Sequence, residues 1–220
     1  MNPPVQPLPH EPAPEMDDAE FFRWYGEWAP LDPTGIAAFM AGFDRPWWVV
    51  GGWSIEAFTG VEREHDDLDI SMLARDAVAF REFLGERFTP WVVGSGAMHP
   101  FTPNHPDVGP EGQLWVRERA GEPWVLDVPL TPDTGGLWTN KRWRPHVAPV
   151  EEVTWVAADG VRYLRPEVTL MMKARLDRPK DRADLDVTWP LLTDAQRAWV
   201  RDTVALAHPG HPWLERLERL

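Results

Sequence analysis

The stretch at residues 47–71 constrains the fold of this chain more than any other. It reads WWVVGGWSIEAFTGVEREHDDLDIS, in which two apolar, strand-like runs are joined through a glycine pair and a short amphipathic segment. A brief helix is predicted to begin at Ser54 and to end at Phe58. The second run carries Asp67 and Asp69, and residues two apart on a strand point to the same face of a sheet. Two carboxylates on one face, beside a glycine turn whose backbone N–H groups can meet phosphates, predict a divalent metal that holds a nucleoside triphosphate.

The same residues also have purely structural explanations. Asp66 and Asp67 could cap a turn, Asp69 could pair with Arg63 or Arg75, and a pair of glycines alone is usually a tight turn. Acids are depleted from strands, however, and are costly to bury without a compensating cation. The metal interpretation is therefore favoured, because only one short helix separates the glycine turn from the two acids.

A third acid lies in a second strand-like region. Residues 113–128 are predicted to form a β-hairpin, and its second strand, WVLDV, holds Asp127 in an otherwise apolar run. An unsupported acid in a central strand is strongly destabilising, so Asp127 either pairs with Arg117 or Arg119 across the hairpin or acts as a third metal ligand. If the two acid-bearing strands are neighbours, the three carboxylates converge.

The rest of the chain divides by composition. Residues 1–15 contain six prolines and are predicted to be a disordered tail. Residues 16–165 are predicted to form an α+β domain, and residues 166–220, where apolar residues recur at helical spacing, a helical C-terminal lobe. Within the first domain, residues 94–112 are predicted to be a long loop and residues 131–150 to be mostly irregular. A basic patch in the latter either offsets nearby acids or touches a triphosphate; it comprises Lys141, Arg142 and Arg144.

Charge and composition exclude several functional classes. The net charge is 22 basic minus 35 acidic residues, or −13, which disfavours binding to nucleic acid or anionic lipid and suits a cationic small substrate. The absence of cysteine excludes thiolate zinc sites and cysteine nucleophiles. The N-terminus lacks the basic start and apolar run of a signal peptide, and no later run approaches the ~18 apolar residues of a membrane span. A soluble, cytoplasmic protein is predicted.

These motifs resemble those of a known family. VVGGWSIEA followed by HDDLDI resembles the signature of the DNA polymerase β-like nucleotidyltransferase superfamily. The tryptophan after the glycines is similar to the aminoglycoside 2″-adenylyltransferase and lincosamide nucleotidyltransferase branch. WVLDVP resembles the strand that bears the third carboxylate, and MKARLDRPKDRAD resembles a basic-then-acidic helical motif of the same branch. Together the matches cover residues 45–190 in the family's order.

The resemblance implies a mixed β-sheet nucleotidyltransferase core flanked by helices, with a helical C-terminal lobe. It implies ATP as the donor and a site for two Mg²⁺ ions, with Asp127 also accepting the proton of the attacking hydroxyl. The implied metal ligands and catalytic residues are Asp67, Asp69 and Asp127. The implied nucleotide-binding residues are Gly51, Gly52, Ser54, Lys173 and Lys180. Lys173 and Lys180 have a structural alternative as solvated helix charges, and Asp181 and Asp184 are expected to pair with neighbouring arginines or to tie the lobes together.

The implied reaction is Mg²⁺-dependent transfer of AMP from ATP to a hydroxyl of a small polar or cationic acceptor, similar to an aminoglycoside or a lincosamide. One alternative is a toxin-type nucleotidyltransferase that acts on RNA or protein, which the acidic charge disfavours. Another is a non-catalytic nucleotide-binding or antitoxin-like partner, which the presence of all three candidate carboxylates disfavours. The loop at residues 94–112 and the segment after Asp127 match no known drug-modifying enzyme, so the acceptor, the nucleobase and the oligomeric state are left open.

Overall fold

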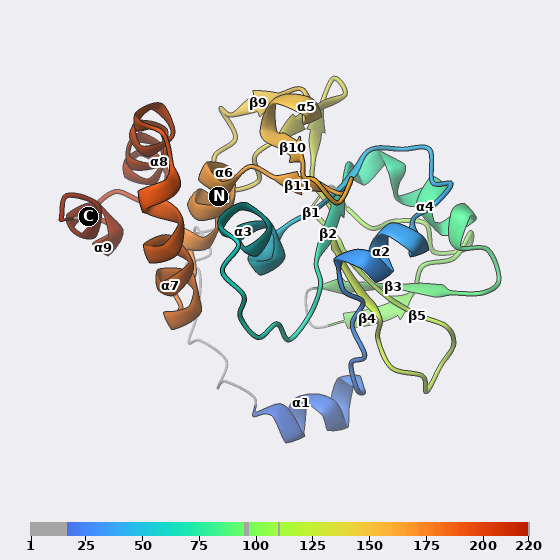
Figure 1. The fold of residues 1–220 in the computed structure, drawn as a ribbon. Coiled ribbons are helices and arrows are strands. Elements are labelled where there is room, and N and C mark those ends of the chain that lie inside the picture. The colour runs from blue at the N-terminus through green and yellow to red at the C-terminus, as the bar shows by residue number, and fades with distance from the viewer. Residues whose placement is uncertain (1–16, 95–96, 110, 220) are drawn as a thin grey trace, which may run out of the picture.

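The computed structural model of the chain describes residues 17–94, 97–109 and 111–219. The proline-rich residues 1–15, predicted to be a disordered tail, lie outside this described part. The protein has the α+β architecture predicted from its sequence, with mixed β-sheets at the centre and helices around them (Figure 1).

Two four-stranded sheets form the centre of the fold. The first has the order β10-β11-β1-β2, in which β1 runs parallel to β11 and antiparallel to β2. The second is antiparallel and has the order β4-β3-β5-β6. The strands of the first are β1 (Trp47–Val49), β2 (Ile70–Met72), β10 (Thr154–Val156) and β11 (Arg162–Leu164). The strands of the second are β3 (Thr89–Gly94), β4 (Ala97–Pro100), β5 (Gln113–Arg117) and β6 (Leu126–Pro129).

The two sheets are joined edge to edge where β2 meets β6. Parallel bridges link Asp69 with Asp127 and Leu73 with Thr131, and the Thr131 amide donates to the Met72 carbonyl at 2.9 Å. The hairpin predicted at residues 113–128 is confirmed as the antiparallel pair β5–β6, and β10 and β11 form a second antiparallel pair. The junction matters for function because it places two strands that are far apart in the sequence side by side.

The helices follow the predicted segments, and several begin at the predicted caps. The Asp17 and Asp32 carboxylates accept hydrogen bonds from first-turn amides, and Thr193 closes a capping box with Gln196. In the central part the helices are α1 (Asp18–Tyr25), α2 (Pro33–Phe39), α3 (Gly51–Thr59), α4 (Ala77–Leu84) and α5 (Val150–Val153). Towards the C-terminus they are α6 (Pro166–Ala174), α7 (Pro179–Thr188), α8 (Asp194–Ala207) and α9 (Pro212–Leu217), with short 3-10 turns at Ala74–Asp76 and Trp189–Leu191.

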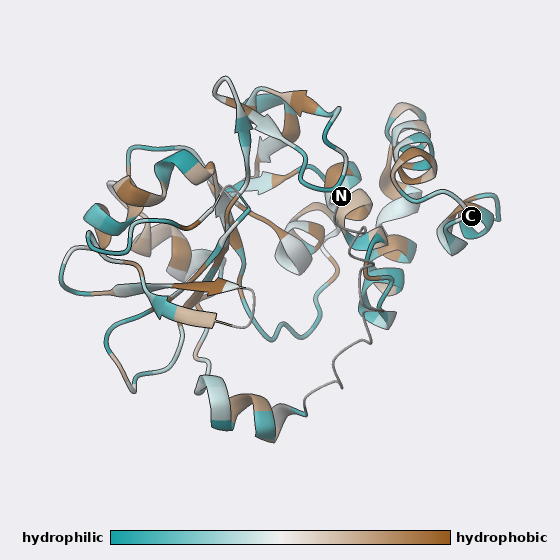
Figure 2. Cartoon of the chain, turned by 180° about the vertical axis from the view of Figure 1, so that it is seen from behind, coloured by the Kyte–Doolittle hydropathy of each residue, from teal (hydrophilic) through white to brown (hydrophobic). Residues whose placement is uncertain are grey.

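Separate clusters of buried side chains stabilise the sheets and the C-terminal helices. Ile70, Phe80 and Val128 belong to the cluster at the sheets, whereas Leu185 and Trp213 belong to the one among α6 to α9. Hydrophobic residues accordingly follow the central strands, and hydrophilic residues follow the connecting loops (Figure 2). None of the helices in the described residues combines the length and apolar character that a membrane span requires. The division into domains at residues 16–165 and 166–220 stays a prediction.

The structure corrects three predictions about local structure. Residues 131–150, predicted to be mostly irregular, contain a three-stranded antiparallel sheet of β7 (Asp133–Thr134), β8 (Leu137–Thr139) and β9 (Val147–Ala148). Strands of two or three residues are too short to show an alternating pattern, and this sheet depends on the burial of Trp138. The predicted loop at residues 94–112 contributes β4, and α3 begins at Gly51 rather than at Ser54.

Candidate active site

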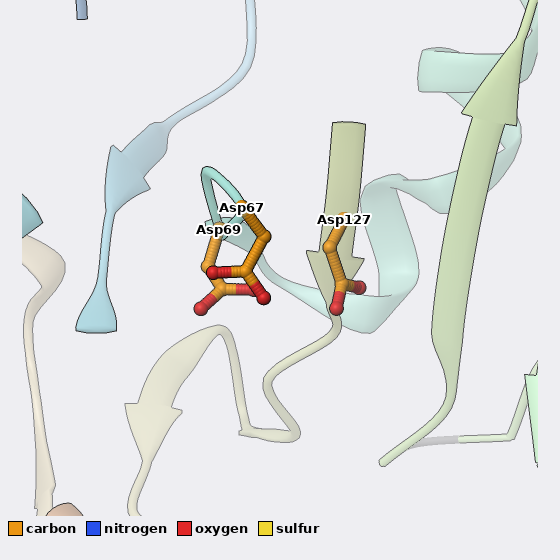
Figure 3. A group of neighbouring side chains, drawn as sticks. All are labelled: Asp67, Asp69 and Asp127. Atoms are coloured by element: carbon orange, nitrogen blue, oxygen red, sulfur yellow. The ribbon is translucent and has the colours of Figure 1, made fainter. Parts of the chain in front are cut away.

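Three carboxylates converge at the junction of the two sheets (Figure 3). Asp67 and Asp69 lie immediately before β2, and Asp127 lies within β6. The parallel bridge between Asp69 and Asp127 brings the strands together, and one oxygen of each carboxylate lies within 4.8 Å of the others. The predicted convergence of the three acids is confirmed as a geometry.

Burial and mutual repulsion make two of these carboxylates, Asp69 and Asp127, expensive to ionise. Burial raises the pKa of Asp127 to about 7, with Asp67 adding to the shift and a hydrogen bond from Gln113 opposing it. The pKa of Asp69 is raised well above its usual range, first by burial and then by the charges of Asp127 and Asp67. A bound divalent cation would relieve both costs. A set of carboxylate oxygens suits Mg²⁺ rather than a soft metal, so the residues present fit the predicted ion.

Gln113 is a member of this site that the sequence did not reveal. Its side-chain amide donates to both oxygens of Asp127, at 2.8 and 2.6 Å, and so holds the carboxylate in one orientation. Gln113 is paired with Pro129 in the β5–β6 register, two positions from the Asp127 pair. Residues at that offset share a sheet face, which is the sequence signal that could have identified it once the hairpin register was known.

The alternative partners proposed for Asp127 are wrong. The Arg117 guanidinium lies over the rings of Trp91 and Trp124, at 4.5 and 4.1 Å from their centroids. Arg119 instead donates to the exposed Glu122 at 3.2 Å. Neither arginine neutralises Asp127, because both are taken up by other partners.

The glycine pair makes room for charged side chains at the start of α3. Gly51 has φ +70°, and a Cβ built there would lie 2.8 Å from Asp69 Oδ2. A Cβ on Gly52 would lie 2.7 Å from Cζ of Arg63 and would overlap the end of its guanidinium. The N-cap residue of the helix, Val50, has no side-chain acceptor. The first-turn N–H groups of α3 therefore lie beside the carboxylates without a side-chain cap.

Gly52→Ala is expected to lower the free energy of unfolding by about 1–3 kcal/mol, because the added methyl group displaces a guanidinium that Asp184 anchors. Urea unfolding at pH 7 measures the change. In an Arg63→Ala background most of this cost should disappear, leaving only the tight approach to His65 Cε1 at 3.0 Å. An equal cost in both backgrounds would show that the guanidinium does not set the requirement for glycine.

Ser54, predicted to hold a phosphate with its hydroxyl, is fully buried. Its hydroxyl donates to the Gly51 carbonyl at 2.9 Å and lies 3.0 Å from the Thr169 hydroxyl of α6. Both partners are protein groups, so a phosphate would have to displace one of them. In this structure Ser54 ties the start of α3 to α6.

A pocket of about 210 Å³ lies against the carboxylates, and its lining includes both Gly51 and Asp69. Four basic residues also line it, namely Lys141, Arg142, Lys173 and Arg178. The remaining lining is largely apolar and includes Trp48, Trp138, Leu164 and Met172. A pocket with one acidic edge and several cations suits a polyphosphate whose metal sits on the acids.

The lysines predicted to bind phosphates are engaged with carboxylates. Lys173 is buried and pairs with Asp181 at 3.1 Å and with Asp184 at 2.7 Å. Lys180 pairs with the exposed Asp66 at 3.1 Å. These ion pairs neither establish nor contradict the predicted contact with a nucleotide, which stays a prediction. Lys173 also lines the pocket.

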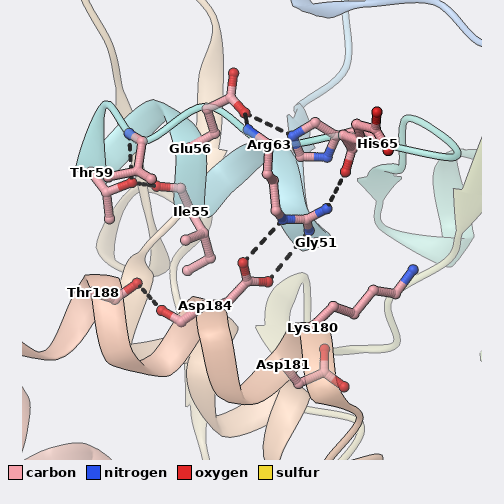
Figure 4. Close-up of polar contacts among 12 residues, drawn as sticks. Gly51, Ile55, Glu56, Thr59, Arg63, His65, Lys180, Asp181, Asp184 and Thr188 are labelled. Carbon is pink, nitrogen blue, oxygen red and sulfur yellow. Dashed lines mark hydrogen bonds and ion pairs between the residues drawn. The ribbon is translucent and has the colours of Figure 1, made fainter.

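Asp181 pairs with a neighbouring arginine as expected, and Asp184 forms the alternative, a tie to a segment outside the C-terminal helices. Asp181 accepts from Arg178 Nε at 2.9 Å, within the C-terminal helices. Asp184 accepts from Arg63 Nε at 3.1 Å, which ties α7 to the segment that leads into the acid-bearing strand (Figure 4).

A carboxylate cluster at the end of a strand, next to a helix N-terminus and a cation-lined pocket, is an arrangement suited to metal-assisted transfer of a phosphoryl or nucleotidyl group. A family model described as aminoglycoside-2''-adenylyltransferase matches residues 34–92. This match confirms the predicted resemblance to aminoglycoside 2″-adenylyltransferases and supports the predicted enzyme class, nucleotidyltransferase. The matched region includes the glycine pair, Asp67 and Asp69, and ends before Asp127.

Three solved structures are similar to this chain. The lincosamide antibiotic adenylyltransferase LnuA, lincomycin-bound, has a TM-score of 0.48 and 16% identity, covering 72% of this chain and 97% of that one. A solution structure of the antibiotic-resistance factor ANT(2'')-Ia has a TM-score of 0.47 and 20% identity, covering 84% and 93%. ANT(2")-Ia in complex with adenylyl-2"-tobramycin has a TM-score of 0.47 and 19% identity, covering 78% and 94%. A search of curated proteins gives no match.

Proposed function

We propose that this chain is a Mg²⁺-dependent nucleotidyltransferase that transfers AMP from ATP to a hydroxyl of a small polar or cationic acceptor, such as an aminoglycoside or a lincosamide. The observation that carries the proposal is the convergence of Asp67, Asp69 and Asp127 beside a pocket lined by basic residues. The family match over residues 34–92 supports the same reaction class. The net charge of −13 favours a cationic acceptor over an anionic one.

In this proposal the three aspartates hold Mg²⁺, which when bound neutralises phosphate charge and lowers the pKa of the attacking hydroxyl. The acceptor oxygen forms a bond to the α-phosphorus, the bond from that phosphorus to the bridging oxygen breaks, and pyrophosphate leaves. Asp127 would accept the proton of the hydroxyl, and it needs no raised pKa for this step because the bound cation lowers the pKa of the hydroxyl itself. Gln113 keeps the Asp127 carboxylate oriented for this transfer.

The phosphates of the donor would lie between α3 and α6. The first-turn amides at Gly51 and Gly52 begin a helix, where the macrodipole and free N–H groups attract anions. Lys173 lines the same pocket and would contact the leaving pyrophosphate. Its ammonium group would then interact with the pyrophosphate as well as with Asp181 and Asp184. Lys180 would reach the pyrophosphate by leaving Asp66, which is an exposed and therefore weak partner.

Incubation with ATP, Mg²⁺ and a panel of aminoglycosides, lincosamides and sugars tests the proposal. We expect pyrophosphate release together with a mass gain of one AMP on an acceptor, and loss of both in Asp67→Asn. Asp66→Asn is the matched control, because this neighbouring carboxylate is exposed and pairs only with Lys180 among the described residues. Turnover that survives Asp67→Asn would overturn the metal assignment. Mg²⁺-dependent nucleotide binding without turnover on any acceptor would favour a non-catalytic binding protein.

A further inference from the structure

The basic residues that line the pocket differ in how their charges are used. Lys173 contacts two carboxylates, and Arg178 donates to both oxygens of Asp181, at 2.9 and 3.2 Å. These cations are already largely compensated by protein anions. A phosphate would have to compete with Asp181 or Asp184 for them.

Lys141 and Arg142 also line the pocket, and neither has such a partner among the described residues. The Lys141 ammonium group donates to the Leu130 carbonyl at 3.3 Å and forms no ion pair with any carboxylate in the residues that the structure describes. Asp127 and Asp69 act on it electrostatically from beyond ion-pair distance. Lys141 and Asp69 thus line the same pocket without forming an ion pair with each other.

The position of Lys141 is built by the small sheet. Asn140 is fully buried, and its side-chain oxygen accepts from the amides of Arg142 and Trp143 at 2.9 and 3.1 Å. The backbone N–H of Asn140 donates to the His146 carbonyl at 2.9 Å. A residue that bonds one side of a turn through its side chain and the other side through its backbone holds that turn in one conformation. Lys141 is thus presented from a rigid turn rather than from a free surface loop.

We propose that Lys141 binds a non-bridging oxygen of the α-phosphoryl group of the nucleotide in the pocket that it shares with Asp69. This inference rests on the proposed function. The phosphoryl group next to the carboxylate cluster is the one that reacts, and its oxygens gain charge during displacement. An ammonium group already fixed beside that position stabilises the charge without reorganisation.

The distribution of basic residue types agrees with this assignment. Only three of the 22 basic residues are lysines, at positions 141, 173 and 180, and the rest are arginines. Lys141 and Lys173 line the pocket, and Lys180 pairs with the acid next to Asp67. An ammonium group acts as a compact point charge on phosphate, whereas the planar guanidinium favours two-oxygen contacts.

Calorimetry with Lys141→Met provides the test. Binding of Mg²⁺ with α,β-methylene-ATP, which keeps all three phosphoryl groups, should weaken about 10- to 100-fold. Binding of Mg²⁺ with pyrophosphate should stay within twofold of the native value, since pyrophosphate lacks the α-position. Binding of Mg²⁺ alone should be unchanged or tighter, because a nearby positive charge has been removed. General damage to the site would weaken all three.

Arg144→Met is the matched control, because Arg144 lies in the same segment as Lys141 but is exposed and pairs with Glu111. It should leave all three titrations unchanged. Equal weakening of nucleotide and pyrophosphate binding in Lys141→Met, or no weakening of either, would overturn the assignment. If the native protein binds no nucleotide, the proposed function fails first, so the two failures are distinguishable.

A second measurement uses the native protein and avoids any folding defect of the variant. Acetylation by an amine-reactive reagent, followed by peptide mass spectrometry, reports on each of the three lysines separately. Mg²⁺ with α,β-methylene-ATP should protect Lys141 from acetylation, and Mg²⁺ with pyrophosphate should not. Equal protection by both, or by neither, would contradict contact with the α-phosphoryl group.

Discussion

Asp127→Asn is expected to lower the rate of AMP transfer by about 10²–10⁴-fold and, at the same time, to stabilise the metal-free protein. The rate falls because the variant loses both a metal ligand and the proposed proton acceptor. Stability rises because the native carboxylate, with a pKa raised to about 7, is costly to ionise in its buried position. A shift of this size from the usual value near 3.9 corresponds to about 4 kcal/mol above pH 7, and poorer bonding to Gln113 offsets about 1–2 kcal/mol of it.

The pH dependence of this gain has a definite sign. A carboxyl group whose folded pKa is raised stabilises the fold in its protonated form, fully below pH ~4, and that stability is lost as the pH rises through about 7. The difference between native protein and Asp127→Asn should therefore be small at pH 5 and largest at pH 8, measured by urea unfolding with a chelator present. A gain of equal size at both pH values would contradict the electrostatic explanation.

The same unfolding measurements, repeated with Mg²⁺ in place of the chelator, test whether Asp127 binds the ion. At about 100 times its dissociation constant, a bound ion should stabilise the native protein by about 2.7 kcal/mol and Asp127→Asn by much less. Asp133→Asn is a suitable control, since Asp133 is only partly buried at β7 and outside the carboxylate cluster. Equal stabilisation of native protein and Asp127→Asn by Mg²⁺ would remove Asp127 from the ligand set.

Asp184→Asn should destabilise the protein by about 3 kcal/mol. The Asp184 carboxylate is buried and accepts from Arg63 at 3.1 Å while pairing with Lys173 at 2.7 Å. Its neutralisation leaves the buried Lys173 with Asp181 alone and removes the charge that holds Arg63. Urea unfolding at pH 7 measures the loss.

Asp186→Asn is the matched control on the same helix. Asp186 pairs with Arg216, but both side chains are more than a third exposed, so the expected loss is below about 1 kcal/mol. If Asp184→Asn were no more destabilising than Asp186→Asn, the buried pairing would be only a surface-like contact, and α7 would not depend on it.

Much of the local structure was predictable from the chain. Asp32 followed by Pro33 marks the start of α2, and alternating apolar residues mark the β5–β6 hairpin, because caps and alternation depend on neighbours in sequence. The shared face of Asp67 and Asp69 and the isolated acid at Asp127 follow from the same local rules. These features indicated three candidate metal ligands before any contact between strands was known, whereas the reaction class was implied by the resemblance to a known family.

The partners of the charged residues in the helical C-terminal lobe could not be predicted from the sequence. Local spacing identifies its helices, but whether Lys173 meets a phosphate or a carboxylate depends on how α6 and α7 pack together. The same is true of Gln113, which is one polar residue among many until the β5–β6 register places its amide on Asp127.

The opening glycine and aspartate motif therefore determined the chemistry of one edge of the site, and the long-range pairing of strands completed it. The bridge from Asp69 to Asp127 assembles the carboxylates, and the turn that follows β8 of the small sheet brings Lys141 to the lining of the same pocket. Turns, caps and alternation act between residues that are close in the chain, so sequence patterns record them directly. Sheet junctions and buried ion pairs depend on non-local packing, which no spacing along the chain specifies.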